Sequence, residues 1–434
     1  MNIFDLIEKK KNYQSLTEEE IQYFVEGYTS GEIPDYQASA LLMAVCFAGM
    51  NSEETLAMTK AMMNSGDIVD LSGIDGITAD KHSTGGIGDK TTLVLIPMLA
   101  ACGLVIAKMS GRGLGYTGGT IDKLESISGF RTSFTKKEFF DTVKESSVII
   151  AAQTASIAPA DKKLYALRDV TNTVDNISLI ASSIMSKKLA CGADNIILDV
   201  KTGSGSFMKN LQEAEELAEV MVKIANGMSK NACAVISDMN QPLGNAVGNA
   251  LEVAEAVRTL KGDGPEDLLE LCLQLGSNLL VICGCYEDAG EAEAVLRKMI
   301  ENGEAFEKLR EIVKNQGGDI SQLEDTSLLP SCPFRLNVKA PEAGFVEKID
   351  SRQIGMASLM SGAGRQTFDS EIDYGAGIVL QKKLGDYVQA GETIASVFSS
   401  DENKLLEAAD RVFESYSFSE EAVSRNTLIY KVVR

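Results

Sequence analysis

Four short apolar segments, separated by helical or polar stretches, constrain the fold of this chain most strongly. Between two of them, NIILDVK and ACAVISDM, the segment LQEAEELAEVMVKIANGMSKN has its apolar residues at the spacing of an amphipathic helix. Strands that alternate with helices are typical of a layered α/β domain, which we expect with a mixed sheet from about residue 70 onward. The four candidate strands are VIAKMS (105–110), SVIIAAQ (147–153), NIILDVK (195–201) and ACAVISDM (232–239).

The first 65 residues predict helices only. In SLTEEEIQYFVEGYTSG, Ser15 or Thr17 can cap a helix that continues with acidic residues and stops at a glycine. A second helical stretch, residues 160–190, interrupts the α/β pattern and is expected to rejoin the N-terminal helices. We therefore predict a discontinuous helical domain, residues 1–65 with 160–190, and a large α/β domain, residues 70–158 with 191–330.

The last hundred residues differ from the rest, because short strands broken by glycine turns replace the longer helices. They predict a small C-terminal α+β domain over residues 335–434. Its segment KLGDYVQAGETIA resembles the turn of biotinyl or lipoyl carrier domains. A carrier needs an exposed lysine at a hairpin tip, usually beside methionine, and residues 335–434 contain no such tip, so a scaffold role is favoured.

Charge and composition exclude several classes of protein. The net charge of −21 repels nucleic acid and anionic membranes, so neither is an expected partner. Eight cysteines without a CxxC pair, and one histidine, do not form a zinc motif and are typical of a reduced, cytoplasmic protein. The N-terminus lacks the features of a secretory signal, and the longest uncharged run, residues 91–107, is too short to span a membrane.

Glycine-rich loops carry the clearest functional signal. HSTGGIGDK, SGRGLGYTGGT and KTGSGSFM follow candidate strands or precede helices, where glycine lets backbone N–H groups approach a phosphate. The first loop does not have the spacing of a P-loop. The second contains GxGxxG at Gly113, Gly115 and Gly118, but no acidic residue follows in the context that dinucleotide binding requires. With these two motifs excluded, the loops predict a site for phosphate or a phosphorylated ligand.

Six motifs, in this order and spacing, resemble the thymidine/pyrimidine-nucleoside phosphorylase family. They are KHSTGGIGDKTT, AKMSGRGLGYTGGTIDKLESI, LYALRDVT, SIMSKK, DVKTGSGSFM and DMNQPLGNAVGNALEV, and the C-terminal GAGRQT and DYGAGIVLQKKLGD also match. The resemblance implies a homodimer of the three domains above. It also implies an enzyme of pyrimidine salvage that cleaves uridine, deoxyuridine and thymidine with phosphate, giving free base and (deoxy)ribose 1-phosphate.

The resemblance also assigns roles to individual residues. His82 is the candidate proton donor or electrostatic partner of the departing base, and Arg168 and Lys187, with Ser183 beside them, are expected to bind the base. Phosphate is assigned to two lysines and four hydroxyl residues, a suitable set for a dianion. These six residues are Lys81, Ser83, Thr92, Lys108, Ser110 and Thr120.

A monovalent cation, taken as potassium, is also implied by the resemblance. Its expected ligands are the backbone carbonyls of Gly88, Lys90, Leu243 and Ala246 and the carboxylate of Glu255. The nearest rival to a phosphorylase is a phosphoribosyltransferase of the related anthranilate type, which depends on magnesium and acidic ligands and would not need the pair of Arg168 and Lys187.

Overall fold

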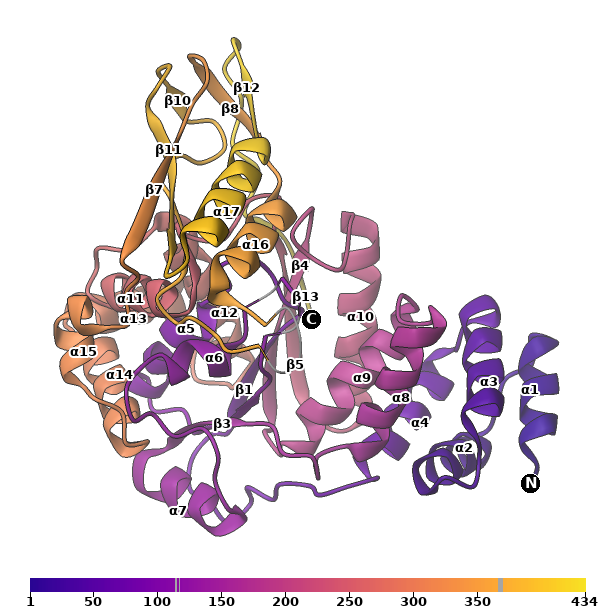
Figure 1. The fold of residues 1–434 in the computed structure, drawn as a ribbon. Helices are drawn as coiled ribbons and strands as arrows, with labels where there is room; N and C mark the ends of the chain where they lie inside the picture. The colour runs from indigo at the N-terminus through magenta and orange to yellow at the C-terminus, as the bar shows by residue number, and fades with distance from the viewer. Residues whose placement is uncertain (114, 117, 366–369) are drawn as a thin grey trace.

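The computed structural model describes residues 1–113, 115–116, 118–365 and 370–434. Leu114 and Thr117 of the second glycine-rich loop, and Gln366 and Thr367 of the GAGRQT motif, lie outside the described residues. The fold class predicted from the sequence is confirmed: a helical bundle, an α/β domain with a mixed sheet and a small α+β domain follow one another (Figure 1).

The N-terminal helices form one side of the molecule, with two later helices packed against them (Figure 1). Thr17 is the N-cap of the second helix, and Glu20 completes a capping box with it. Leu164 and Leu179, from the later helices, belong to the same apolar core as Phe24. These helices are α1 (Ile3–Lys11), α2 (Glu18–Ser30), α3 (Asp35–Ala48), α4 (Ser52–Met63), α8 (Pro159–Thr171) and α9 (Ile177–Ala190).

The central sheet has three parallel strands and one antiparallel strand, in the order β1-β4-β5-β13. A parallel pair, β2 and β3, continues it beyond β1 through a bridge between Thr78 and Val105. The strands are β1 (Ala79–Ser83), β2 (Ile106–Ser110), β3 (Val148–Ala152), β4 (Asn195–Thr202), β5 (Asn231–Asp238) and β13 (Ile429–Val433).

Helices cover both faces of this sheet, and residues of β4 alternate between the two cores as the pleat requires. Ile197 faces the core that contains α5 and α12, whereas Ile196 and Leu198 face the core that contains α9 and α10. The helices of this domain are α5 (Thr91–Ala101), α6 (Thr120–Glu125), α7 (Lys136–Ser146), α10 (Leu211–Gly227), α11 (Asn249–Leu260), α12 (Glu266–Ile282), α13 (Ala289–Glu301), α14 (Glu304–Asn315) and α15 (Ser321–Glu324).

The C-terminal domain stands above the α/β domain in Figure 1 and contains two small antiparallel sheets. One has the order β6-β9-β11-β7, so that β6, which belongs to the α/β part of the chain, joins it. The other has the order β10-β8-β12. The elements are β6 (Ala246–Gly248), β7 (Phe334–Lys339), β8 (Gly344–Ile349), β9 (Gly377–Leu380), β10 (Tyr387–Val388), β11 (Thr393–Ser399), β12 (Tyr416–Ser419), α16 (Ser351–Ser358) and α17 (Glu402–Glu414).

The structure differs from the sequence prediction at two strands. The strand β1 was not among the four candidates, because three of its five residues are Asp80, Lys81 and His82 rather than apolar residues. The last strand, β13, pairs with β5 in the α/β sheet, although the predicted C-terminal domain extended to residue 434. The other predicted domain boundaries stay predictions.

Candidate active site

The glycine-rich loops meet at one edge of the α/β sheet. The strands β1, β2 and β4 end at Ser83, Ser110 and Thr202, and each is followed by one of the loops. Because carboxyl ends of parallel strands lie at the same edge, this is where α/β proteins bind ligands. Helix α5 begins directly after the first loop, without a side-chain cap, so its first N–H groups suit an anion.

A cavity of about 410 Å³ lies at this edge, between β1 and β2 on one side and α8 and α9 on the other. All the residues that the sequence assigned to phosphate, to the base and to catalysis line it, although they come from segments up to about a hundred residues apart. The structure therefore brings the predicted set together, while the role of each member stays a prediction. These residues are Lys81, His82, Ser83, Thr92, Lys108, Ser110, Thr120, Arg168, Ser183 and Lys187.

Lys108 lies within a buried group of charges. Its Nζ atom is 3.5 Å from Oδ1 of Asp80 and donates a hydrogen bond to the carbonyl of Lys81. The other oxygen of Asp80 accepts a hydrogen bond from Lys188 at 2.9 Å. Burial lowers the pKa of Lys108 to about 7, since Asp80 offsets only part of that effect and the neighbouring lysines add to it. An arriving phosphate dianion would favour the charged ammonium.

Lys81 is paired with acidic groups before any anion arrives. Its ammonium donates to the hydroxyl of Thr91 and lies 3.7 Å from a carboxylate oxygen of Asp89 and 3.7 Å from one of Asp199. Burial acts to raise the pKa of Asp89, but Lys81 and two other lysines outweigh it and hold that pKa well below its ordinary value. The ionised Asp89 and the nearby Asp199 fix the lysine beneath the first loop.

His82 is neutral in the free protein. Burial lowers its pKa well below 6.5, and the positive charges of Lys188, Lys108, Lys81 and Lys187 lower it further. Its Nε2 atom is buried and, among the residues that the structure describes, has no hydrogen-bond partner. His82 lines the cavity, and a buried ring nitrogen without a partner is a feature that calls for an explanation.

The opposite wall holds the residues predicted to bind the base. The guanidinium of Arg168 is 3% exposed and donates to the carbonyls of Thr173, Val174 and Leu179 at 2.8–3.1 Å. This network fixes the side chain and leaves two of its five N–H donors unassigned. Lys187 donates to Asp161 at 2.6 Å and to the hydroxyl of Ser183 at 3.2 Å. Arg168 is therefore buried, so it is not an ordinary charged residue of the surface.

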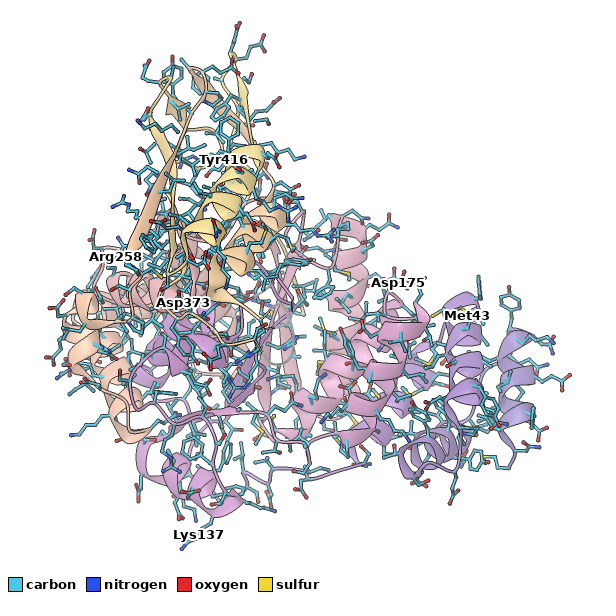
Figure 2. The ribbon with its side chains drawn as sticks, viewed as in Figure 1. Met43, Lys137, Asp175, Arg258, Asp373 and Tyr416 are labelled. Carbon is cyan, nitrogen blue, oxygen red and sulfur yellow. The ribbon has the colours of Figure 1, made fainter. Side chains whose placement is uncertain are left out.

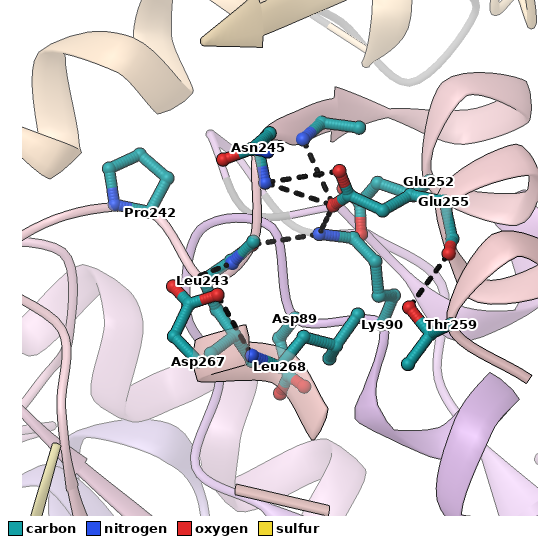
Figure 3. Close-up of polar contacts among 12 residues, drawn as sticks. Asp89, Lys90, Pro242, Leu243, Asn245, Glu252, Glu255, Thr259, Asp267 and Leu268 are labelled. Carbon is teal, nitrogen blue, oxygen red and sulfur yellow. Dashed lines mark hydrogen bonds and ion pairs between the residues drawn. The ribbon is translucent and has the colours of Figure 1, made fainter. Parts of the chain in front are cut away.

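The five residues predicted to hold potassium lie close together, and the ammonium of Lys90 already binds two of the predicted oxygen ligands, those of Leu243 and Glu255 (Figure 3). Nζ of Lys90 is 2.8 Å from the carbonyl oxygen of Leu243 and 2.8 Å from Oε2 of Glu255. Burial would lower the pKa of Lys90, but Glu255 and Glu252 outweigh it and raise that pKa above its ordinary value. The residues present do not fit a potassium ion, because the charge of Lys90 is in its place.

Comparison with known proteins identifies the family. Residues 4–66 match the family model "Glycosyl transferase family, helical bundle domain", and residues 75–306 match the model of the α/β domain of the same family. "Pyrimidine nucleoside phosphorylase C-terminal domain" fits residues 345–419. The chain is 53% identical to the pyrimidine-nucleoside phosphorylase of Staphylococcus haemolyticus over 100% of both chains, and 54% identical to that of Bacillus subtilis over 97% of both. The chain belongs to the pyrimidine-nucleoside phosphorylase family.

A likeness to a solved structure shows how widely this fold is shared beyond the pyrimidine-nucleoside phosphorylase family. Anthranilate phosphoribosyltransferase from Thermus thermophilus superposes with a TM-score of 0.59 at 19% identity, covering 72% of this chain and 99% of that one. At this identity the likeness shows the fold alone. Over the described ranges, no helix has both the length and the apolar character needed to cross a membrane.

Several residues of the site were missed by the sequence analysis. Asp80 and Lys188 join β1, β2 and α9 through their ion pair, and Asp161 positions Lys187. Tyr165 and Phe207 add aromatic surface to the cavity wall. The one signal in the sequence was position: Asp80 precedes Lys81, and Lys188 follows Lys187, both of which the resemblance had assigned to the site. Their burial could not be predicted without the fold.

Proposed function

We propose that this chain catalyses the phosphorolysis of the pyrimidine nucleosides uridine, deoxyuridine and thymidine, as part of pyrimidine salvage. The products are the free base and ribose 1-phosphate or deoxyribose 1-phosphate. The observation that carries this proposal is the single cavity that has an anion-binding edge on one side and fixed basic donors on the other. Family membership, with relatives named for this activity over their full length, supports the same reaction.

Phosphate is the nucleophile in the proposed reaction. Lys108 and Lys81 are the cations proposed to face it, and the hydroxyls of Ser83, Thr92, Ser110 and Thr120 provide directional donors. One phosphate oxygen forms a bond to the anomeric carbon of the sugar. The bond between that carbon and the ring nitrogen of the base breaks, and its electron pair leaves with the base.

The departing base gains negative charge, and His82 is the residue proposed to meet it. Bound phosphate would offset the surrounding lysines and raise the pKa of His82, so that the imidazole can donate a proton or a charged hydrogen bond to the carbonyl oxygen of the base. The place of His82 in the cavity lining and its unpartnered, buried Nε2 atom support this role.

The base itself is proposed to bind between Arg168, Ser183 and Lys187. A pyrimidine edge offers two carbonyl acceptors and one N–H donor, which match two cationic donors and a hydroxyl. Asp161 and the three backbone carbonyls that hold Arg168 keep these side chains oriented before the substrate arrives. Potassium, the predicted cofactor, has no part in this proposal, because Lys90 already provides the cation among the predicted ligands.

We also propose that the protein is a cytoplasmic homodimer. All eight cysteines are free thiols, which supports a reducing compartment. Helix α3 exposes Tyr36 (74%), Met43 (37%) and Phe47 (78%) at spacings of one helical face, and Figure 2 places Met43 at the surface of the helical domain. An exposed apolar face of this kind supports docking against a second copy.

A spectrophotometric assay of base release tests the proposed reaction. Uridine, deoxyuridine and thymidine are each incubated with the protein in buffers with and without inorganic phosphate. We expect release only with phosphate, and a rate about 10²- to 10⁴-fold lower for His82→Ala. Lys223→Ala, on the exposed face of α10, is the matched control and should retain the full rate.

Two results would contradict the proposal. Equal rates in phosphate-free buffer would identify a hydrolase, because water would then replace phosphate as the nucleophile. An unchanged rate in His82→Ala would exclude that residue from the chemical step while leaving phosphorolysis intact.

A further inference from the structure

Two loops of the active-site domain are joined by a buried lysine. One is the phosphate loop after β1, which ends at Lys90, and the other is the segment 241–246 before β6. The Lys90 side chain crosses from the first loop to the second and donates to Leu243 and Glu255 at 2.8 Å each. The side chains of Lys90 and Glu255 are both 0% exposed, so water does not compete for these bonds.

The oxygen atoms around this ammonium are those of a cation site. A Cβ atom built on Gly88 would lie 2.5 Å from the Leu243 carbonyl, 3.2 Å from the Ala246 carbonyl and 3.3 Å from Nζ of Lys90. Two carbonyls and the ammonium therefore surround one small space. Gly88 has a φ of +71° and leaves no room for a side chain, so the close approach requires glycine.

The positive charge of Lys90 balances the negative charge of Glu255 in this space. Oε2 of Glu255 accepts from Lys90 and also from the backbone N–H groups of Asn245 and Ala246 at 3.0 Å (Figure 3). The carbonyls of Gly88 and Lys90, two of the predicted ligands, accept backbone hydrogen bonds from Lys90 and Leu93. Glu252, the next buried carboxylate, is already paired with Lys123 at 2.7 Å. A second cation in the same space would therefore meet the ammonium without an unpaired carboxylate to balance it.

We propose that the ammonium of Lys90 is a covalently tethered replacement for a monovalent metal ion at this position. An ammonium and a potassium ion carry the same charge and are both satisfied by carbonyl and carboxylate oxygens. The tether makes the cation permanent, so the phosphate loop stays attached to segment 241–246 whatever the potassium concentration. The inference concerns ion binding and stability, and it holds or fails independently of the substrate.

Thermal unfolding in different salts tests this proposal. The wild-type protein and two variants are compared in KCl, NaCl and choline chloride at equal ionic strength. Lys90→Ser removes the ammonium and opens the space, while Lys90→Met fills the space without charge. We expect the same Tm for the wild type in all three salts. Both variants should unfold about 5 °C or more below it in choline chloride, because Glu255 loses its buried partner.

The decisive comparison is the response of the variants to potassium. Lys90→Ser should regain part of its lost stability with a saturable dependence on KCl, because an ion then enters the vacated space. Lys90→Met should not respond. Rubidium, which scatters anomalously, should give a peak among Leu243, Ala246 and Glu255 in crystals of Lys90→Ser and none there in the wild type.

Either of two outcomes would overturn the proposal. A saturable, potassium-specific rise in the wild-type Tm, with a rubidium peak beside Glu255, would show that an ion binds despite the lysine. A Lys90→Ser protein that folds but ignores potassium would show that these oxygens are no cation site. Neither readout uses enzymatic activity, so a failure here is distinguishable from a failure of the proposed phosphorolysis.

Discussion

His82 connects binding of phosphate to the charge of the site. Without an anion, burial and four nearby lysines keep its pKa well below 6.5 and the imidazole neutral. The unfolded chain has an ordinary histidine pKa near 6.5 and binds a proton first as the pH falls. His82 therefore reduces the free energy of unfolding of the free protein below about pH 6.5, and bound phosphate should relieve that loss.

Nuclear magnetic resonance can follow this residue alone, because the chain contains one histidine. We expect the imidazole carbon signals to titrate below pH 6.5 in chloride, and at a clearly higher pH when phosphate is present at the same ionic strength. The added anion offsets the lysine charges and stabilises the protonated ring. A titration midpoint that is identical in both buffers would place the phosphate away from His82.

Lys90 shows where sequence reasoning about single residues reaches its limit. The resemblance placed Gly88, Lys90, Leu243, Ala246 and Glu255 together, and the structure does bring them together. The prediction assigned only the backbone carbonyl of Lys90 to the site, whereas the side chain turns inward and supplies the positive charge. Which way a long side chain points depends on the packing of residues that lie about 165 positions away, and no local pattern reports it.

At the scale of elements, β1 is a strand whose interior side chains are charged. Asp80, at the second position, is buried and holds Lys108 of β2 and Lys188 of α9. Burial acts to raise the pKa of Asp80, but these two lysines outweigh it and lower that pKa. Apolar periodicity found β2, β3, β4 and β5 and missed β1, because buried ion pairs replace apolar contacts there.

The substitution Asp80→Asn should therefore destabilise three elements at once. Removing one member of a buried ion pair costs about 3–5 kcal/mol, because Lys188 then remains as an uncompensated buried charge. Asp194→Asn is the matched control, since Asp194 is 65% exposed in its ion pair with Lys230 and should cost under about 1 kcal/mol. Urea denaturation at pH 7 measures both values, and equal losses would contradict the buried network.

The glycine-rich loops, by contrast, were predictable as elements. The second and third follow predicted strands, the first precedes a predicted helix, and all three carry hydroxyl residues; these local features are visible in sequence. Their meeting at one edge follows from the parallel arrangement of β1 and β4 and of β2 and β3. The cavity opposite them depends on where α8 and α9 pack, which is a property of the whole fold.

At the scale of the whole molecule, the cavity is built by the helical and α/β parts of the chain, and the C-terminal domain is attached to the α/β part. One attachment is Lys383, which donates to the carbonyl of Gly244 at 2.7 Å and to Asp267 at 3.0 Å. Arg365 pairs with Asp122 of α6 at 3.0 Å. The helical domain provides the cavity wall proposed to bind the base, and also the exposed apolar face of α3 proposed as the dimer contact.

The proposed dimer predicts a specific effect of charge on α3. Phe47→Glu places a carboxylate in the apolar face and should convert a dimer into a monomer of the 46.6 kDa chain in analytical ultracentrifugation. Leu406→Glu is the matched control, because Leu406 is 55% exposed on α17 in the C-terminal domain, and this variant should remain dimeric. A wild-type protein that sediments as a monomer at micromolar concentration would exclude the proposed assembly.

The pairing of β13 with β5 affects how the protein is made on the ribosome. Residues 231–238 are synthesised almost two hundred residues before their partner, residues 429–433. During that interval one edge of the central sheet has open backbone donors and acceptors, which are prone to pair with other chains. The central sheet is therefore complete only once residues 429–433 have been synthesised, and a ribosome that stalls before them leaves the β5 edge open to pairing with other chains.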